Sequence, residues 1–414
     1  MSHTKYPKLR WPLDIKLESY EGQKILLIRC PTGISEEPLL LVPAVGPLIA
    51  CFDGKTSVPE ITAKFASYGI KDEVVLELIA LLDKHLYLEG PTFSAAQRKI
   101  LESFKNESSR KAFMAGLSYA ADGAALRSEL AQYLQHKVGA DSLSPKGPML
   151  GFVAPHIDYR RGHVCYGKSY NQLALEDHDL YILIGTSHQY SDLMFHLTKK
   201  DFESPLGTLP CDTAFVEELA KRYGYERSFA DELLHRREHS LELQVPFIKY
   251  LKTNPKIVPI LVGSFSEMLG VEKAPREFDQ YESFAASLAE CVGQRRAQGQ
   301  RVLVVAGVDM AHVGRFFGDP GSLSDAFMQQ IEVRDRIYLD TLLKQDKERL
   351  FAHIAQDNDA RRVCGFPTLY TVLDVFERLG LKYRGQLYDY RQAVNLQNDC
   401  AVTFAGLGMY EQMA

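Results

Sequence analysis

The sequence predicts an α/β domain with a largely parallel sheet flanked by helices, preceded by a small α+β domain. From residue 149 onward, short apolar runs alternate with amphipathic segments, a pattern typical of β-α-β units. The chain has 414 residues, more than one ordinary hydrophobic core accommodates, so two domains are expected. We therefore expect a first domain at 1–93, a helical linker at 94–111 and the α/β domain at 112–414.

The first domain has the composition of a small independent unit. Strand-like runs at 24–30 and 39–43 come first, and an Asp53-Gly54 turn follows them. Helical spacing of apolar residues then appears at 58–69 and 72–89. This order of elements predicts a winged-helix-like fold.

The α/β domain contains strand and helix candidates in alternation. The strand candidates are 149–154, 180–185, 193–198, 256–263, 301–308 and 400–408. The helix candidates include 213–223, 230–250, 278–298, 322–344 and 366–379.

The composition and the absence of certain motifs argue against several classes of protein. The formal net charge is −5, and this balance does not favour a nucleic-acid partner. No apolar run approaches the roughly 20 residues of a membrane helix, and the N-terminus lacks the apolar region of a secretory signal. The seven cysteines form no CxxC pair, which favours a reducing cytoplasm. Neither a P-loop nor a GxGxxG or GxSxG motif is present, so nucleotide-dependent and serine-hydrolase chemistry have no support.

Two histidines directly follow predicted strands. His156 stands in Ala-Pro-His after the run 149–154, and His188 stands in Gly-Thr-Ser-His after the run 180–185. Parallel strands place their carboxyl ends at one edge of a sheet, where ligands bind. A lone histidine is most often a hydrogen-bonded core or surface residue, but two in successive units favour a site for a divalent transition metal.

Three further residues at strand or helix ends are candidates for chemistry. Cys364 precedes a helical segment, where the helix dipole favours a thiolate; it is a third ligand, a reactive thiol or a buried structural cysteine. Asp309 and His312 follow the most apolar run. The carboxylate orients the histidine, or His312 acts as an acid–base group, or Asp309 only caps a helix.

The segment HRREH offers a competing hypothesis. His235, Glu238 and His239 match the signature of inverted zinc peptidases, in which both histidines share one face of a helix and the glutamate is the base. Two arginines inside the motif are unusual beside a metal cation, and the following LELQVPF is typical of core packing.

Taken in order, the motifs resemble the Memo family, which includes the AmmeMemoRadiSam system protein B-like proteins and shares its fold with LigB-like class III extradiol dioxygenases. The matching segments of this chain are APHIDY, GTSHQ, SPLGTLPCD, EHSLELQVPF, GVDMAH and CGFP. Residues 1–93 resemble the PqqD-like peptide-recognition family in their order of elements, the Asp53-Gly54 turn and the helix start.

The resemblance implies a role for each matching residue. His156, His188 and Cys364 match the three metal-ligand positions, and Asp309 and His312 match the polar pair facing the metal, with His312 as acid–base group. Glu238 and His239 match a pair of pocket residues typical of the family, and Ser187, Tyr159 and Asp158 are further expected pocket residues.

The chain also departs from the family pattern. Ile157 and Asp158 replace two small residues, Gln189 replaces a second histidine, and Cys364 stands where the dioxygenases use a carboxylate ligand. One divalent metal is therefore expected, with Fe(II) or copper favoured over zinc. We expect either a redox enzyme, dioxygenase-like, acting on a small molecule or peptide, or a non-catalytic adaptor that uses the same pocket. Family relatives are associated with radical-SAM proteins, which makes such a protein a candidate partner.

Overall fold

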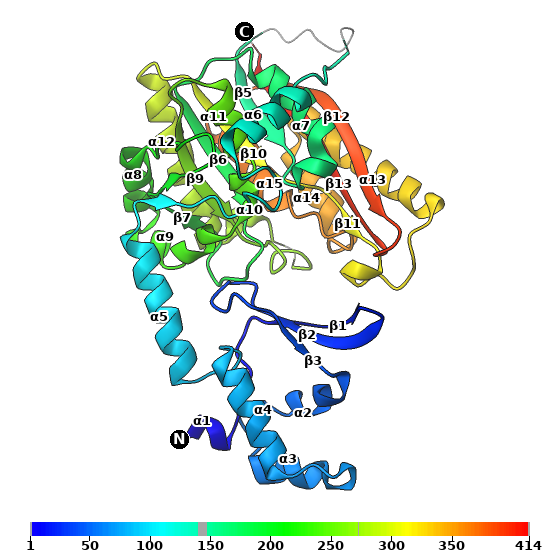
Figure 1. Ribbon diagram of the computed structural model, residues 1–414. Coiled ribbons are helices and arrows are strands. Elements are labelled where there is room, and N and C mark those ends of the chain that lie inside the picture. The colour runs from blue at the N-terminus through cyan, green and yellow to red at the C-terminus, as the bar shows by residue number, and fades with distance from the viewer. Residues whose placement is uncertain (1, 140–146, 272, 413–414) are drawn as a thin grey trace. The chain divides into compact units, whose positions relative to one another are not determined.

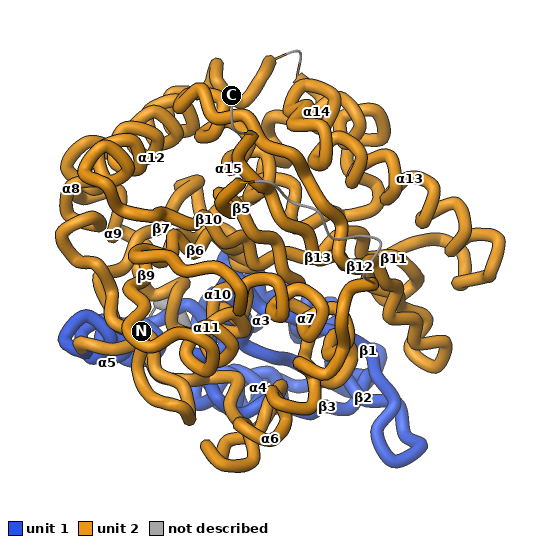
Figure 2. Tube along the Cα trace, turned by 90° about the horizontal axis from the view of Figure 1, so that it is seen from above, with its two compact units in different colours: residues 1–107 blue, residues 108–414 orange. Residues whose placement is uncertain are grey.

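The computed structural model describes residues 2–139, 147–271 and 273–412 (Figure 1). The chain divides into two compact units, residues 1–107 (unit 1) and 108–414 (unit 2), coloured separately in Figure 2. The division falls within the segment 94–111 that the sequence indicated as a linker. Most of that segment belongs to a single helix of unit 1, α5 (Pro91–Asn106).

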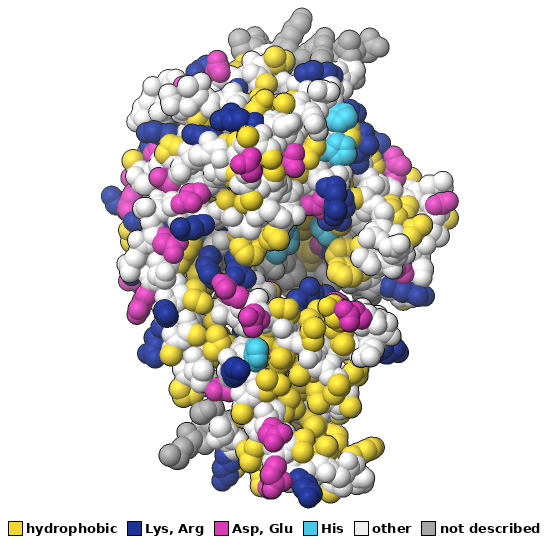
Figure 3. All heavy atoms as spheres, in the orientation of Figure 1, with side chains coloured by type: hydrophobic (Ala, Val, Ile, Leu, Met, Phe, Trp, Pro, Cys, Tyr) yellow, Lys and Arg dark blue, Asp and Glu magenta, His cyan; other side chains and the backbone are white. Residues whose placement is uncertain are grey.

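Unit 1 contains a three-stranded antiparallel sheet with helices packed on one face. The strands, in the order β1-β2-β3, are β1 (Asp14–Tyr20), β2 (Gln23–Arg29) and β3 (Leu39–Leu41). The helices are α1 (Ser2–Lys5), α2 (Gly46–Ile49), α3 (Val58–Lys64), α4 (Asp72–Lys84) and α5. Leu26 and Ile28 of β2 pack with Ile61 and Leu82 in its core. Hydrophobic side chains also gather on the face of unit 1 shown in Figure 3, and Leu17 of β1 is 68% exposed.

Strand β1 was not expected from the sequence. Its residues alternate charged and apolar side chains, and most of them are exposed, so the apolar content of the segment is low. Strand β1 pairs with β2 along its whole length, from Asp14 opposite Arg29 to Tyr20 opposite Gln23. Main-chain pairing with a buried neighbour therefore defines this strand, and its own hydrophobicity does not.

Unit 2 is built on an eight-stranded mixed sheet flanked by helices on both faces. The strand order is β11-β13-β5-β10-β6-β9-β7, and β12 pairs with β13. The strands are β5 (Met149–Ala154), β6 (Leu180–Thr186), β7 (Phe195–Leu197), β9 (Lys256–Val262), β10 (Val302–Gly307), β11 (His312–Val313), β12 (Tyr383–Asn395) and β13 (Cys400–Glu411). Two short strands, β4 (Ser109–Arg110) and β8 (Asp201–Phe202), form a separate parallel pair.

The sheet is parallel only at its centre, whereas a largely parallel sheet was expected from the sequence. Strands β5, β10, β6 and β9 pair in parallel. Strands β7, β11, β12 and β13 pair antiparallel at the two sides. A single tight hairpin connects β12 to β13, and a direct connection of this kind requires antiparallel pairing.

The central strands are buried on both faces because helices cover each face. Side chains of one parity, such as Val153 and Ile182, pack in the core with helices α8, α12 and α15. Side chains of the other parity, such as Phe152 and Leu183, pack with helices α6, α7 and α11. The helices of unit 2 are α6 (Gly123–Tyr133), α7 (Tyr159–Leu173), α8 (Thr213–Tyr223), α9 (Tyr225–Phe229), α10 (His239–Glu242), α11 (Val245–Leu251), α12 (Asp279–Ala297), α13 (Asp325–Leu343), α14 (Lys347–Ala355) and α15 (Phe366–Arg378).

The expected helix at 230–250 is instead three short pieces. A 3₁₀ turn runs over Glu232–Arg236, α10 begins at His239, and α11 begins at Val245 with Pro246 in its first turn. Proline is favoured at such a first turn and disfavoured within a helix. No helix among the described residues combines the length and apolarity that a membrane span requires.

Candidate metal centre

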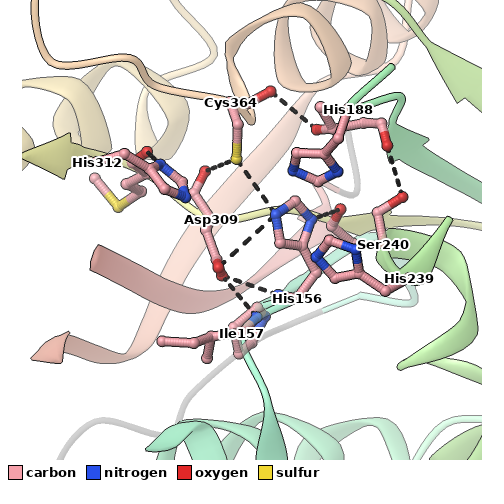
Figure 4. Close-up of polar contacts among 12 residues, drawn as sticks. His156, Ile157, His188, His239, Ser240, Asp309, His312 and Cys364 are labelled. Atoms are coloured by element: carbon pink, nitrogen blue, oxygen red, sulfur yellow. Dashed lines mark hydrogen bonds and ion pairs between the residues drawn. The ribbon is translucent and has the colours of Figure 1, made fainter. Parts of the chain in front are cut away.

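The carboxyl ends of three parallel strands lie side by side at one edge of the sheet. Gly307 of β10 pairs with Ala154 of β5 and with Gly185 of β6. His156 lies two residues after Ala154, Asp309 lies two residues after Gly307, and His188 lies three residues after Gly185. The predicted convergence of these segments is therefore present, and Figure 4 shows His156, His188 and Asp309 directed toward a common centre.

His156 forms the buried floor of this centre. It is 1% exposed, and its backbone N–H donates to Asp309 Oδ1 at 2.9 Å. Its ring Nδ1 lies 3.0 Å from the carbonyl oxygen of Gly307, which can only accept, so Nδ1 carries the proton. Nε2 is therefore left with a free lone pair facing the centre. Burial, followed by repulsion from His188 and His239, holds the pKa of His156 well below its usual value.

His188 is oriented by a buried carboxylate. Glu238, 5% exposed, accepts from the backbone N–H of His188 at 2.9 Å and contacts the ring Nδ1 through Oε1 at 3.0 Å. A carboxylate on one ring nitrogen fixes the tautomer and leaves the other nitrogen toward a metal. Burial opposes a charge on His188, but the Glu238 carboxylate raises the pKa of the imidazole well above its usual value. The reciprocal attraction overcomes burial and holds the pKa of Glu238 well below its own.

His239 completes a group of three imidazoles. Its ring stacks on that of His188, with centroids 4.7 Å apart, and lies 5.1 Å from the ring of His156. One ligand atom from each of the three histidines lies within 4.8 Å of the other two. Burial lowers the pKa of His239 to about 4, so one of its ring nitrogens has a free lone pair at neutral pH. His239 was expected as a pocket residue or, with His235, as a zinc ligand of a peptidase, and the structure places it within this histidine group.

Cys364 lies beside the histidine group. Its Sγ is 3.3 Å from Nε2 of His156, to which the thiol donates, and 3.6 Å from the backbone oxygen of Asp309. Burial raises the pKa of the thiol, although the neighbouring His188 lowers it in part. The helix dipole of α15 was expected to favour a thiolate, and burial outweighs that effect here. A bound cation would instead lower the pKa of the Cys364 thiol, because metal ligation deprotonates a thiol.

Asp309 and His312 face the group from the β10 side. Asp309 is 2% exposed, and burial raises its pKa to about 7. Its Oδ1 accepts from the backbone N–H groups of His156 and Ile157, so it holds the turn after β5. The ring Nδ1 of His312 lies 3.1 Å from the carbonyl oxygen of Met310. A backbone carbonyl, and not Asp309, therefore orients His312, and burial lowers the pKa of this histidine to about 4.

The remaining polar residues of the segment 238–244 hold neighbouring elements in place. The Ser240 hydroxyl donates to the carbonyl of Thr186 at 2.8 Å, and Gln244 Nε2 donates to the carbonyl of Pro155 at 2.9 Å. Glu242 is fully buried and forms an ion pair with Arg110, which is also fully buried. These roles could not be inferred from the sequence, since glutamate and glutamine within a helical segment are usually on the solvent side.

A cavity of about 1020 Å³, here called the main cavity, opens above the histidine group. His188 and His239 have 36% and 33% of their side chains exposed, whereas His156 has 2%. The walls of the main cavity come from four segments remote in sequence, and their members include Tyr119, Tyr133, Ile157, Asp158, Arg161, Asp309, His312, Phe317, Asn395, Asn398 and Cys400. A cavity of this size accommodates an organic molecule much larger than the metal ligands.

The zinc-peptidase interpretation of His235, Glu238 and His239 fails on geometry. His235 lies on the 3₁₀ turn and His239 on α10, so the two are not on one face of a single helix. His235 is 1% exposed, and its Nε2 donates to the backbone oxygen of His196 at 3.0 Å. Burial lowers the pKa of His235 to about 3. It is a neutral core histidine, and Glu238 serves His188 instead.

The other expected pocket residues have different surroundings. Ser187 donates its hydroxyl to the carbonyl of Gln189 at 3.1 Å and shapes the turn after β6. Asp158 lines the main cavity and caps α7 by accepting from the backbone N–H of Arg161 at 3.1 Å. Tyr159 is fully buried and donates to the carbonyl of Leu243 at 2.6 Å, so it belongs to the core beneath the cavity.

The donor chemistry of the group fits a divalent transition metal. Three imidazoles with a neighbouring thiol match the nitrogen and sulfur ligands that zinc, iron and copper accept. Nitrogens bound at about 2.0–2.1 Å to one ion lie roughly 3–3.5 Å apart, so small rotations of these rings would suffice. The Gly307 carbonyl holds His156 in the tautomer whose Nε2 can accept, and Glu238 fixes the ring of His188, whose Nε2 proton a bound cation would displace. The fold and the site thus define an α/β protein with a candidate His₃ metal centre.

Comparison with known proteins identifies the family. The Memo-like protein family model matches residues 110–408, and the chain belongs to this family. A MEMO1 family protein of Aquifex aeolicus is 29% identical over 407 residues, covering 98% of this chain and all of that protein. MEMO1 family proteins of Archaeoglobus fulgidus (28% over 260 residues) and Sulfolobus acidocaldarius (29% over 280 residues) cover 63% and 65% of this chain, and 86% and 88% of their own lengths.

Proposed function

We propose that the chain is a metal-dependent redox protein that binds one Fe(II) or copper ion at His156, His188 and His239, with Cys364 as a further or exchanging ligand. The single observation that carries this proposal is the three imidazoles within 4.8 Å of one another at the floor of a large cavity. Zinc would also suit the donor set, and the softness of the ligands alone does not choose among the three metals. When bound, such an ion would supply electron transfer or activation of an oxidant.

The residues around the proposed metal site have separate roles in orientation and proton transfer. His156 and Glu238 are buried, so they fix the ring positions before any ligand arrives. His312 presents its free Nε2 to the main cavity, and Asp309 carries a carboxyl whose pKa is raised to about 7. Near neutral pH Asp309 would therefore exchange a proton with a molecule in the cavity, whereas His312, whose pKa is lowered to about 4, would be neutral and would serve as a hydrogen-bond acceptor. The substrate class in this proposal is a small molecule or peptide that occupies the main cavity.

The test is metal content after anaerobic purification of the full chain. We expect close to one equivalent of iron or copper in the wild type. His156→Ala, and separately His239→Ala, should lose most of it, and His163→Ala provides a control histidine whose ring contacts His136 and Tyr133 away from the group. Cys364→Ala distinguishes a ligand thiol, which when removed lowers affinity, from a neighbour that only donates to His156.

Two results would contradict the proposal. One is a His156→Ala, Cys364→Ala double variant that retains full metal. The other is wild-type protein that takes up no stoichiometric metal from Fe(II) or Cu solutions under anaerobic conditions. The second result would favour a non-catalytic adaptor that uses the cavity to bind a peptide or small ligand.

For unit 1 we propose a winged-helix-like, PqqD-like module that binds an extended peptide or a partner protein. Support comes from its three-stranded antiparallel sheet and from exposed apolar residues such as Leu17 and Val42. A radical-SAM protein is the proposed partner, and the cytoplasm the proposed compartment. Co-purification from native cells, followed by hydrogen exchange on the full chain, should reveal protection within 14–42; protection confined to residues after 108 would contradict this assignment.

A further inference from the structure

A second cavity touches the histidine group from a different side. This side cavity has a volume of about 350 Å³ and is lined by residues that follow β6, residues that follow β9, and the loop before α15. His188 lines both cavities, whereas Cys364 lines the side cavity and not the main one. His156, His239, Asp309 and His312 line only the main cavity. The group can therefore be approached from two directions that meet at His188.

The side cavity is suited to small molecules. Its volume is about a third of that of the main cavity. Ser264 and Ser266, both exposed, lie at its mouth. The hydroxyl of Thr186 donates to the carbonyl of Cys364 at 2.9 Å, which fixes the inner end. A ligand of main-cavity size does not fit in this volume.

The walls favour uncharged molecules. Phe265, Leu269 and Phe366 supply apolar surface. The guanidinium of Arg362 is engaged elsewhere, with Asp319 at 2.6 Å and with the carbonyl of His312 at 3.0 Å. The carboxyl of Asp359 also lines this cavity, and it disfavours an anion. His188 also lines this cavity, and its ring is paired with the Glu238 carboxylate. An anion therefore finds no unpaired cation here and faces the Asp359 carboxyl, whereas an uncharged molecule meets no repelling charge.

We infer that the side cavity is a second entrance to the centre, which admits uncharged molecules of a few non-hydrogen atoms to Cys364 and His188 while a larger molecule occupies the main cavity. Dioxygen and hydrogen peroxide are the redox-active members of this class. That chemical assignment rests on the proposed metal function, whereas the existence of a separate entrance does not. The arrangement would let an oxidant and an organic ligand reach His188 from opposite sides.

Two cysteines allow the entrances to be followed separately in the metal-free full chain. Cys364 lines the side cavity and Cys400 lines the main cavity. The rate at which iodoacetamide alkylates each cysteine, measured by peptide mass spectrometry, reports on the entrance that the cysteine lines. Ser264→Trp should slow Cys364 about tenfold and leave Cys400 unchanged. Asn398→Trp, at the main cavity, should do the reverse.

A pair of reagents matched in size and different in charge tests the chemical class. Iodoacetate is close to iodoacetamide in size but carries a negative charge. After normalisation to the unfolded chain, iodoacetate should be disfavoured at Cys364 more strongly than at Cys400, since Arg161 lies near Cys400 and favours an anion there. Equal discrimination at both cysteines would overturn the preference for uncharged molecules.

Other outcomes overturn the separate entrance itself. Slowing of Cys364 by Asn398→Trp, or no slowing by Ser264→Trp, would mean that the thiol is reached through the main cavity or by local unfolding. Ser266→Trp is a second variant at the same mouth in case Ser264→Trp fails to fold. Failure of the metal proposal appears independently, as absent metal in the wild type, and leaves these alkylation rates unaffected.

Discussion

Replacement of Arg110 by methionine should strongly destabilise unit 2. Arg110 does not line the main cavity, and its side chain is fully buried. The guanidinium pairs with the buried Glu242 carboxylate. It also donates to the carbonyls of His235 at 2.9 Å, Lys111 at 3.0 Å and Glu238 at 2.7 Å. Methionine preserves most of the side-chain volume and removes every one of these donors.

The magnitude follows from what the substitution leaves behind. Glu242 keeps its other donors, the backbone N–H of Met114 and the hydroxyl of Tyr119, both at 2.6 Å, but loses its countercharge. Removing one partner of a buried ion pair costs about 3–5 kcal/mol. A domain is stable by about 5–15 kcal/mol, so the variant should lose a fifth or more of the free energy of unfolding. Because Glu238 would lose the donor on its carbonyl, metal affinity should fall as well.

The assay is equilibrium urea unfolding of the full chain followed by far-ultraviolet circular dichroism. Tryptophan fluorescence reports on unit 1, since Trp11 is the single tryptophan of the chain, and it should hardly change. Arg301→Met is the matched control. Arg301 pairs with Asp179 at 3.1 Å, but the two side chains are 59% and 42% exposed, so its loss should cost no more than about 1 kcal/mol.

A double-mutant cycle with Glu242→Gln provides the decisive comparison. The neutral amide needs no countercharge, so Arg110→Met with Glu242→Gln should be less destabilising than the sum of the two single changes by about 2 kcal/mol. Additive effects, or a loss below about 1 kcal/mol in Arg110→Met, would refute the view that this buried pair supports the segment that carries Glu238 and His239.

Three further predictions concern other contacts of unit 2. Glu238→Gln should weaken metal binding about 10–100-fold in chelator competition, since the amide no longer fixes the tautomer of His188. Burial lowers the pKa of His196 from 6.5 to about 4, so as the pH falls this histidine is protonated in the unfolded chain before it is protonated in the folded chain. Its contribution to the free energy of unfolding should therefore fall by about 2 kcal/mol between pH 7 and pH 5, and His196→Phe should remove that part of the urea-midpoint shift. Gly162→Ala should cost about 1–3 kcal/mol, because a Cβ there would lie 2.7 Å from Cγ2 of Ile157.

Each of these has a control. Glu267→Gln, at an exposed position, should leave chelator competition unchanged. If the pH dependence of His196→Phe equals that of the wild type, the buried neutral imidazole is not its source. Gly321→Ala, where a new Cβ meets nothing within 4 Å, should be close to neutral. Ile157→Ala should rescue Gly162→Ala in part if the clash is the cause, because Tyr166 Cε2 also lies 2.9 Å from the new Cβ.

The sequence predicted the buried part of the fold well and the exposed part poorly. Strands β5, β6, β9 and β10 lie within a residue or two of their expected ranges, because strands buried on both faces are continuous apolar runs. Strand β12 was missed, since many of its residues are partly or fully exposed and its hydrophobic pattern is weak. Main-chain pairing with β13 stabilises it, and that pairing is not visible in local composition.

For the candidate site, the sequence indicated which residues converge but not which contact which. His156, His188, Asp309, His312 and Cys364 do come together, since they follow aligned strands or precede α15. The position of His239 depends on the break between the 3₁₀ turn and α10, and regular helical spacing would have placed it beside His235. That break results from the buried contacts of Glu238 and Glu242, which join segments more than 40 residues apart.

The antiparallel hairpin β12–β13 gives this fold a simple route to new specificity. The histidine group rests on the parallel strands and on segment 238–244, whereas Asn395, Asn398 and Cys400 near the hairpin turn line the opposite wall of the main cavity. Insertions at such a turn lengthen a hairpin without changing the register of the strands behind it. During divergence, the wall of the main cavity can therefore change through this turn while the histidine group stays fixed.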